Sequence, residues 1–254
     1  MKKVLIIARP EGASDLLWAN SINLEKGFKS LAADINQAAK AAFDFGAEVM
    51  TFTPVASYHI YNWLHLPYLD KRIKSVSEKE IYDNIADISA VVLIGMTAKA
   101  GTMNAFMDGT YNGVAWHDYF LNGVLCGEIG IYKAYFSHFG VPIVFASGDI
   151  AACKEAEEEI NGIKTVAVKK AICRNRAEKI LGATDKFYSV LIDALKNPPA
   201  VSDKIQLPAV VRITLNRTEF CDDCLRWFSF LKRIDARTLE KHIENIKTIY
   251  DLIV

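Results

Sequence analysis

The chain has 254 residues, 51% of them hydrophobic, and its 30 basic and 30 acidic side chains give a net charge of zero. This balance argues against a general attraction to nucleic acid or to an acidic membrane surface, so we expect neither as a partner. No segment reaches the roughly 18 uninterrupted apolar residues of a membrane span. The five cysteines are scattered and odd in number, which favours reduced thiols in a cytoplasmic protein.

Apolar strands and helices alternate through the first half of the chain. Residues Met1–Ala8 contain a non-alternating apolar run, which predicts a buried strand. Residues Ser21–Phe45 repeat apolar side chains at three- and four-residue steps, which predicts a long helix that Gly46 ends. The other elements predicted here are a strand at Glu48–Thr53, a short helix from Ser77 with Glu80 in a capping box, a strand at Ala90–Gly95 and a polar loop at Thr97–Tyr111.

The second half continues this alternation after a hairpin. Asn122-Gly123 lies between two apolar runs, which predicts a tight turn within a hairpin at Trp116–Cys126. The elements predicted next are helices at Gly127–Phe139, Ile150–Ile160 and Ala183–Lys196 and strands at Val141–Ala146 and Lys164–Ala171. The pattern predicts an α/β fold with a mainly parallel central sheet flanked by helices.

A proline-rich stretch divides the chain. It runs from Asn197-Pro198-Pro199 to Pro208 and is typical of a linker. We therefore expect an α/β core domain at residues 1–197 and a smaller C-terminal α+β portion at residues 198–254, packed on or beside it. The elements predicted there are a strand at Ala209–Leu215, a helix at Thr218–Phe228, a strand at Phe230–Ile234 and a last helix with Leu239, Ile243, Ile246, Tyr250 and Ile253 on one face.

Charged residues gather where the first strand ends. Arg9, Glu11 and Gly12 follow this strand directly, and α/β proteins build sites at the carboxyl ends of strands. Glu128 lies at the start of a predicted helix, where the helix N-terminus stabilises a carboxylate. Glu11 and Glu128 therefore either have separate structural roles or form half of a hydrolytic metal site in one cleft.

Other motifs have a plainer interpretation. The loop Gly95–Gly101 lacks the Gly-Lys-Ser/Thr ending of a phosphate-binding loop, so an ordinary turn is favoured. Cys221 and Cys224 have no second close pair to complete a zinc site, so two half-buried helix residues are favoured over a metal or redox pair. The acidic run Glu155–Glu159 is typical of a solvated helix face.

The histidines give one site candidate. His59 and His65 lie among aromatic residues, where packing is favoured over metal ligation. His117, which Asp118 follows near the predicted hairpin, is the better candidate for a catalytic side chain.

Residues 122–179 resemble the D-aminopeptidase (DppA-like) family of zinc metallopeptidases. The similarity is carried by a Gly-Glu-x-Gly at residues 127–130 before a helix, a Gly-Val-Pro at 140–142, a Ser-Gly-Asp at 147–149, "KEAEEEI" at 154–160 and "TVAVKKAICRNRA" at 165–177. It continues more weakly over residues 1–53 and 90–111. The resemblance implies two-zinc activation of water, release of N-terminal D-amino acids from short peptides, and assembly into a homo-oligomer.

The resemblance also implies which positions would bind zinc. The family uses an Asp-x-Glu-Gly after the first strand, a His after each of the next two strands, and the Glu of Gly-Glu-x-Gly. Glu11 and Glu128 match two of these five positions. The remaining three fall at Arg9, near Val55 with His59 four residues on, and at Thr97. The position of a further, catalytic His falls near Asp108.

Arg9 is the most consequential of these replacements, because a guanidinium is not deprotonated in proteins and does not bind zinc. We therefore expect Arg9 to pair with Glu11, Glu128 or both, as a bidentate fork if space allows.

Three functions follow as hypotheses. The first is a family member with a degenerate two-zinc site that binds a small molecule or short peptide in a cleft of Arg9, Glu11, Thr97 and Glu128, with hydrolysis altered or lost and no cofactor. The second is an active peptide or amide hydrolase with a rebuilt site that uses Glu11, Glu128, Asp108 and either His59 or His117, with one metal such as zinc or without metal. The third is an unrelated enzyme that reuses the cleft.

Overall fold

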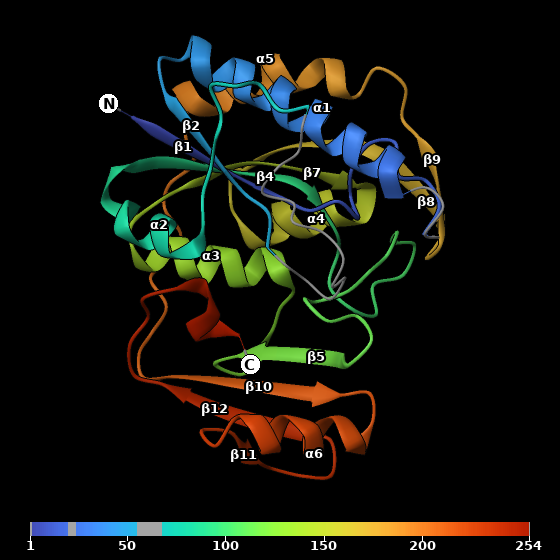
Figure 1. Ribbon diagram of the computed structural model, residues 1–254, viewed down its shortest axis with the longest axis vertical. Coiled ribbons are helices and arrows are strands. Elements are labelled where there is room, and N and C mark those ends of the chain that lie inside the picture. Colours follow the sequence, from blue (N-terminus) through green and yellow to red (C-terminus); the bar gives the residue numbers. More distant parts are fainter. Residues whose placement is uncertain (1, 20–23, 55–67, 254) are drawn as a thin grey trace.

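A seven-stranded sheet forms the centre of the computed structural model, which describes residues 2–19, 24–54 and 68–253 (Figure 1). Its order is β3-β2-β1-β4-β7-β8-β9, and every neighbouring pair is parallel except β8 and β9. The strands are β1 (Lys3–Ala8), β2 (Glu48–Phe52), β3 (Lys74–Ser75), β4 (Ile88–Met96), β7 (Ile143–Asp149), β8 (Lys164–Cys173) and β9 (Arg176–Lys179). The predicted mainly parallel α/β sheet is confirmed.

Helices cover both faces of this sheet because its strands are apolar on both faces. Val4 and Ile6 pack in one core cluster with α1 (Leu24–Asp44) and α5 (Phe187–Lys196). Leu5 and Ile7 point the other way and belong to a second cluster. The helices on that side are α2 (Glu78–Asp83), α3 (Glu128–His138) and α4 (Ile150–Glu159), with the single turn η3 (Ile85–Asp87) beside them. A further single turn, η4 (Thr184–Lys186), precedes α5. The capping box of α2 on Ser77 and Glu80 is confirmed.

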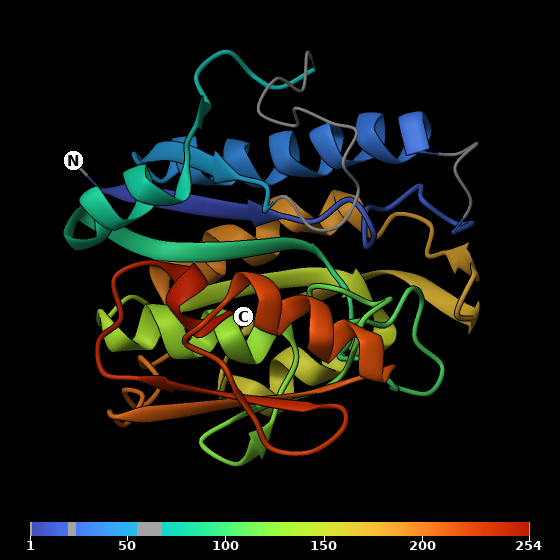
Figure 2. The same ribbon diagram turned by 60° about the horizontal axis from the view of Figure 1, so that its bottom comes forward.

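A second, antiparallel sheet packs on the outer side of α3 (Figures 1 and 2). Its order is β11-β12-β10-β5-β6, so strands from both sides of residue 197 build it. The strands are β5 (Trp116–Leu121), β6 (Val124–Leu125), β10 (Ala209–Leu215), β11 (Lys232–Arg233) and β12 (Thr238–Ile243), with α6 (Thr218–Trp227) after β10. Asn122 and Gly123 join β5 to β6 with φ of 50° and 80°, which confirms the predicted hairpin turn.

The predicted last helix is wrong. Residues 238–243 form β12, which pairs with β10 from Ala209↔Ile243 to Thr214↔Thr238, and only the 3₁₀ turn η5 (Ile249–Leu252) is helical. Leu239 and Ile243 are four residues apart, a spacing that fits one face of a strand as well as one face of a helix. Pairing with a distant strand decides between them. No helix among the described residues is long and apolar enough to cross a membrane.

Candidate functional site

The candidate site lies where the strand order reverses. After β1 the chain adds β2 and β3 on one side, and β4 lies on the other, so the ends of β1 and β4 form the switch point at which open α/β sheets bind ligands. The two strand ends are tightly packed: the Gly12 N–H donates to the Gly95 carbonyl at 2.9 Å. A Cβ at Gly12 would lie 2.2 Å from that same carbonyl, so only glycine fits after Glu11.

Arg9 joins two carboxylates from different elements. Its Nη2 atom lies 3.4 Å from Oε1 of Glu11, two residues along, and 3.1 Å from Oε1 of Glu128, the first residue of α3. Arg9 is only 4% exposed and Glu128 is fully buried. The predicted pairing with Glu11, Glu128 or both is confirmed, and Arg9 pairs with both acids. The bidentate fork expected if space allowed is not formed, because a single guanidinium nitrogen contacts both carboxylates.

Burial and charge oppose one another in this cluster. Burial disfavours the charged guanidinium, yet Glu11 and Glu128 outweigh burial and raise the pKa of Arg9 above its ordinary value. Burial raises the pKa of Glu128, although Arg9 and the N–H of Tyr111, which donates to Oε1 at 2.9 Å, act against this rise. Nε of Arg9 and the Oε2 atoms of both acids have no hydrogen-bond partner within the described part of the chain. The cluster therefore holds unsatisfied polar atoms, which natural proteins seldom bury without a purpose.

A cavity of about 430 Å³ opens beside this cluster. The loop after β1 lines it with Arg9 and Glu11, and the loop after β4 lines it with residues from Thr97 to Tyr111. Trp116 adds an aromatic wall, and the β8–β9 turn contributes Arg174. The volume is in the range of small-molecule sites.

The predicted site residues converge only in part. Arg9, Glu11, Thr97, Asp108 and His117 all line the cavity, whereas Glu128 lies beneath Arg9 and is not part of the lining. The structure thus brings five of the six predicted residues to one cavity.

Asp108 and His117 are both engaged with neighbours. The Asp108 carboxylate accepts the Gly101 N–H at 2.7 Å and pairs with Nε of Arg174 at 2.9 Å, so it ties the loop to the β8–β9 turn. The side chain of His117 is 65% exposed, with Nδ1 lying 2.9 Å from Oδ2 of Asp118. In the described part of the chain, neither side chain forms a hydrogen bond or ion pair with Arg9, Glu11 or Glu128.

The residues described do not fit a two-zinc site. Within residues 2–19, 24–54 and 68–253, no group of three or more His, Cys, Asp or Glu side chains could hold a metal ion. Two carboxylates are in place, and the cation between them is a guanidinium, which has no lone pair to donate. Val55, His59 and His65 lie outside the described residues.

The acidic run on α4 is not wholly solvated, and that prediction needs correction. Glu155 is buried because α4 packs this edge against the loop after β4, where Oε2 accepts the Lys99 N–H at 2.7 Å. Burial raises the pKa of Glu155 to about 7. On α6, Cys221 is buried, Cys224 is half-buried, and burial raises the pKa of both thiols, as expected for packing residues.

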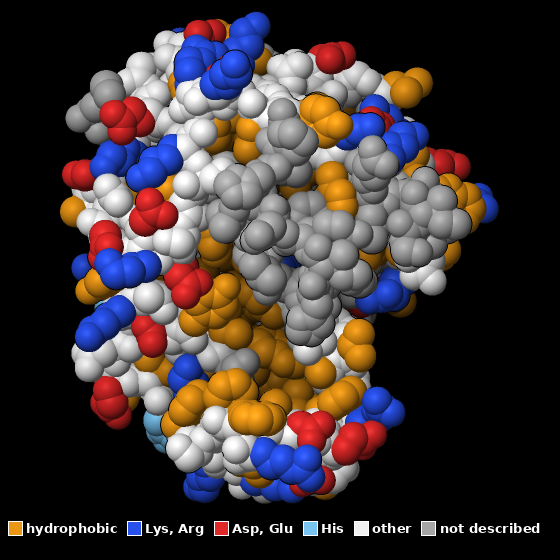
Figure 3. Space-filling view, in the orientation of Figure 1, with side chains coloured by type: hydrophobic (Ala, Val, Ile, Leu, Met, Phe, Trp, Pro, Cys, Tyr) orange, Lys and Arg blue, Asp and Glu red, His pale blue; other side chains and the backbone are white. Residues whose placement is uncertain are grey.

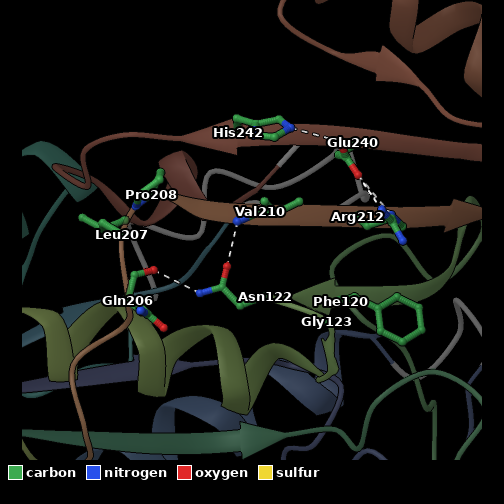
Figure 4. A pocket seen from close by; sticks show the side chains of 10 residues that line it. All are labelled: Phe120, Asn122, Gly123, Gln206, Leu207, Pro208, Val210, Arg212, Glu240 and His242. Atoms are coloured by element: carbon green, nitrogen blue, oxygen red, sulfur yellow. Dashed lines mark hydrogen bonds and ion pairs between the residues drawn. The ribbon is translucent and has the colours of Figure 1, made fainter.

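A second hollow lies on the outer face of the antiparallel sheet and is larger, at about 720 Å³ (Figure 4). Arg212 pairs with Glu240 through Nη2 and Oε2 at 2.6 Å, and Nε2 of His242 lies 3.1 Å from Oε1 of the same acid. The Glu240 carboxylate therefore has partners in both Arg212 and His242, on the solvated face of the antiparallel sheet. The hollow contains none of the predicted site residues.

Four residues in or next to the site are not among those that the sequence predicts for it. Tyr111 falls in a predicted loop, Trp116 falls in a predicted hairpin, and Arg174 falls in no predicted element. Lys169, buried beneath the cavity loops, had one signal: a lysine in the middle of the apolar strand "TVAVKKAIC".

The sheet, the switch point and the carboxylates after β1 and at the start of α3 define an α/β protein with a cluster of buried charged residues at its strand ends. The family model described as D-aminopeptidase matches residues 3–254, so the chain belongs to the D-aminopeptidase family.

A curated relative and a solved structure are also similar to this chain. The D-aminopeptidase of Bacillus subtilis (strain 168) is 32% identical over 84 residues, which cover 33% of this chain and 30% of that enzyme. A solved structure, described as the Zn-dependent D-aminopeptidase DppA from Bacillus subtilis, a self-compartmentalizing protease, matches with a TM-score of 0.84. It covers 99% of this chain and 94% of its own at 18% identity, which shows a shared fold.

Proposed function

We propose that this chain is a D-aminopeptidase-family protein with a degenerate two-zinc site, and that its cavity binds a small molecule or short peptide with hydrolysis altered or lost. One observation carries the proposal: Nη2 of Arg9 lies within 3.4 Å of both carboxylates that the family resemblance assigns to metal binding. A fixed cation therefore lies between the two acids and offsets one of their two charges, so a metal is not needed to hold them together in a buried place.

Purified protein should therefore hold little zinc. The test is zinc content by mass spectrometry after dialysis against zinc and then buffer, combined with hydrolysis of short peptides that carry an N-terminal D-amino acid. We expect far less than one zinc per chain and no cleavage. Thermal shift with the same peptides, and with their L counterparts, measures binding without hydrolysis. A peptide that raises the melting temperature without being cleaved would support the proposal directly.

The second candidate is a hydrolase with a rebuilt zinc site. The observation that favours it is the Oε2 atom on each of Glu11 and Glu128, which has no hydrogen-bond partner in the described structure and is free to ligate. This candidate predicts stoichiometric zinc that is lost in both Glu11→Gln and Glu128→Gln. In that case Asp108 and His117 are the catalytic candidates on the cavity wall. Stoichiometric zinc of this kind would contradict the first candidate.

We also propose that the protein is a cytoplasmic homo-oligomer. All five cysteines are free, which suits a reducing compartment. The relative with the same fold is described as self-compartmentalizing. Apolar side chains gather on the face shown in Figure 3. Trp227, at the end of α6, is 81% exposed, and Phe230, in the turn after it, is 56% exposed. Exposed aromatic residues of this kind mark interfaces.

A further inference from the structure

Lys169 is a lysine with no exposed surface, in the middle of β8. Lysine is almost never fully buried, because removing an ammonium group from water is costly. Its neighbour Lys170 is exposed on the same strand, so the strand does offer a solvated position for a lysine. The buried position must therefore be explained by what Lys169 contacts.

The side chain of Lys169 reaches two backbone carbonyls of one loop. Nζ donates to the carbonyl of Glu11 at 3.0 Å and to the carbonyl of Leu16 at 2.7 Å. This loop follows β1 and carries the carboxylate that pairs with Arg9. Because the Glu11 carbonyl is fixed, the peptide that directs the Glu11 side chain toward Arg9 is fixed as well.

The same group also contacts the second loop of the cavity. Nζ lies 4.4 Å from the centre of the Phe106 ring, a cation–π distance. Phe106 belongs to the loop after β4, and Oδ2 of Asp149 accepts its N–H at 2.7 Å. Leu16 and Phe106 pack together with Ala171 and Ala177 in a small cluster over β8 and β9. Lys169 thus stands under both loops that line the cavity.

We infer that Lys169 is a positioning residue of the candidate site, which holds the loop of Glu11 and the loop of Phe106 in a fixed arrangement around the cavity. The inference rests on the proposed function, since the arrangement has a purpose only if the cavity binds a ligand.

The chemistry of the amine suits this role. Burial lowers the pKa of Lys169 to about 7, although Asp149, Asp34, Glu11 and Asp15 favour the charged form. Both the amine and the ammonium donate hydrogen bonds, so the two carbonyl contacts persist through the titration. The two carbonyl contacts therefore do not depend on the charge state, whereas the contact with Phe106 is a cation–π interaction only while the amine is protonated.

Amide hydrogen exchange of the full chain tests the inference. The variant Lys169→Met removes the donors and keeps most of the volume, and Lys170→Met is the matched control on the same strand. We expect the amides of residues 12–16 and of Phe106 and Met107 to exchange at least about tenfold faster in Lys169→Met, since two hydrogen bonds are lost. Amides of β10 and β12 should exchange as in the wild type, and Lys170→Met should match the wild type throughout.

Unchanged exchange in both loops would overturn the inference. Equal acceleration in β10 and β12 would also overturn it, because it would show a general loss of stability. If Lys169→Met does not fold, Lys169→Gln, which keeps an NH2 donor group on a shorter side chain, replaces it, and the same acceleration confined to the two loops is expected. Failure of both variants to fold would make Lys169 a residue of global stability and contradict the inference. Exchange needs no ligand, so it can succeed or fail independently of the zinc and peptide measurements that test the proposed function.

Discussion

Nη2 of Arg9 lies 3.1 Å from Oε1 of Glu128, so a cation that follows β1 meets the carboxylate that begins α3. The pair is almost completely buried, and Glu11 is the second carboxylate at the same nitrogen, at 3.4 Å. Loss of one partner from such a pair leaves an uncompensated charge in a poorly solvated place, which costs more than the pair itself contributes.

Arg9→Met should destabilise the protein strongly. The substitution keeps a long apolar side chain but leaves two buried carboxylates without a cation, and breaking a buried pair in this way costs about 3–5 kcal/mol. Urea denaturation followed by circular dichroism measures the free energy of unfolding. The double variant Arg9→Met, Glu128→Gln should recover a large part of the loss because one buried charge is gone. A double variant no more stable than Arg9→Met would show that Arg9 acts mainly through packing.

Arg9→Asp should increase metal binding. It replaces the guanidinium with a third carboxylate beside Glu11 and Glu128, and three acidic oxygen ligands attract a divalent cation that two acids and an arginine do not. The measurement is zinc and manganese per chain after dialysis against each metal. Arg9→Asn, which removes the cation and adds no charge, is the control and should bind less. Equal metal content in Arg9→Asp and the wild type would contradict the argument that Arg9 excludes the metal.

The sequence predicted the centre of this site better than its surroundings. Arg9, Glu11 and Glu128 are at recognisable positions, next to a strand end and a helix start, and pairing of opposite charges follows from their types. The geometry of these ion pairs could not be predicted from the sequence, because it depends on how α3 is placed relative to β1. Glu155 and Lys169 appeared as ordinary charged residues of a helix and a strand. They are buried because loops that are distant in the sequence pack against them. A local sequence pattern does not show such long-range packing.

The C-terminal strand β12 shows the same limit in the fold. Leu239 and Ile243 repeat with a spacing that both a strand and a helix allow, and their partner strand β10 begins at Ala209, which pairs with Ile243. By contrast, the buried run of β1 and the Asn122-Gly123 turn were predictable, since a continuous apolar run and a type I′ turn depend on neighbouring residues alone.

Glu155 should make stability fall as the pH rises toward neutrality. Burial raises its pKa to about 7 from an ordinary value near 4.5, so between these values the folded state binds a proton that the unfolded state has released. The contribution of Glu155 to the free energy of unfolding is therefore fully present below about pH 4.5 and is lost progressively up to about pH 7. The loss is at most on the order of 3 kcal/mol. Glu155→Gln keeps the acceptor for the Lys99 N–H and cannot titrate.

The difference between Glu155→Gln and the wild type isolates this contribution from other titrating groups. Chemical denaturation at a series of pH values from 5 to 8 should show the wild type losing stability relative to Glu155→Gln across this interval. A difference that is constant with pH would mean that Glu155 is ionised throughout, and that the Lys99 contact outweighs its burial.

The exposed aromatic residues at the end of α6 and in the turn after it should contribute to self-association. Trp227 is 81% exposed and Phe230 is 56% exposed, and burying two such side chains between copies of the chain is a large favourable contribution. We expect light scattering after gel filtration to give the wild type a mass above that of one chain. The double variant Trp227→Ser, Phe230→Ser should shift it toward the mass of a single chain. Leu181→Ser, at an 88% exposed position in the turn after β9, is the control and should leave the mass unchanged. A wild type that is monomeric, or a double variant with the wild-type mass, would show that this segment is not an interface.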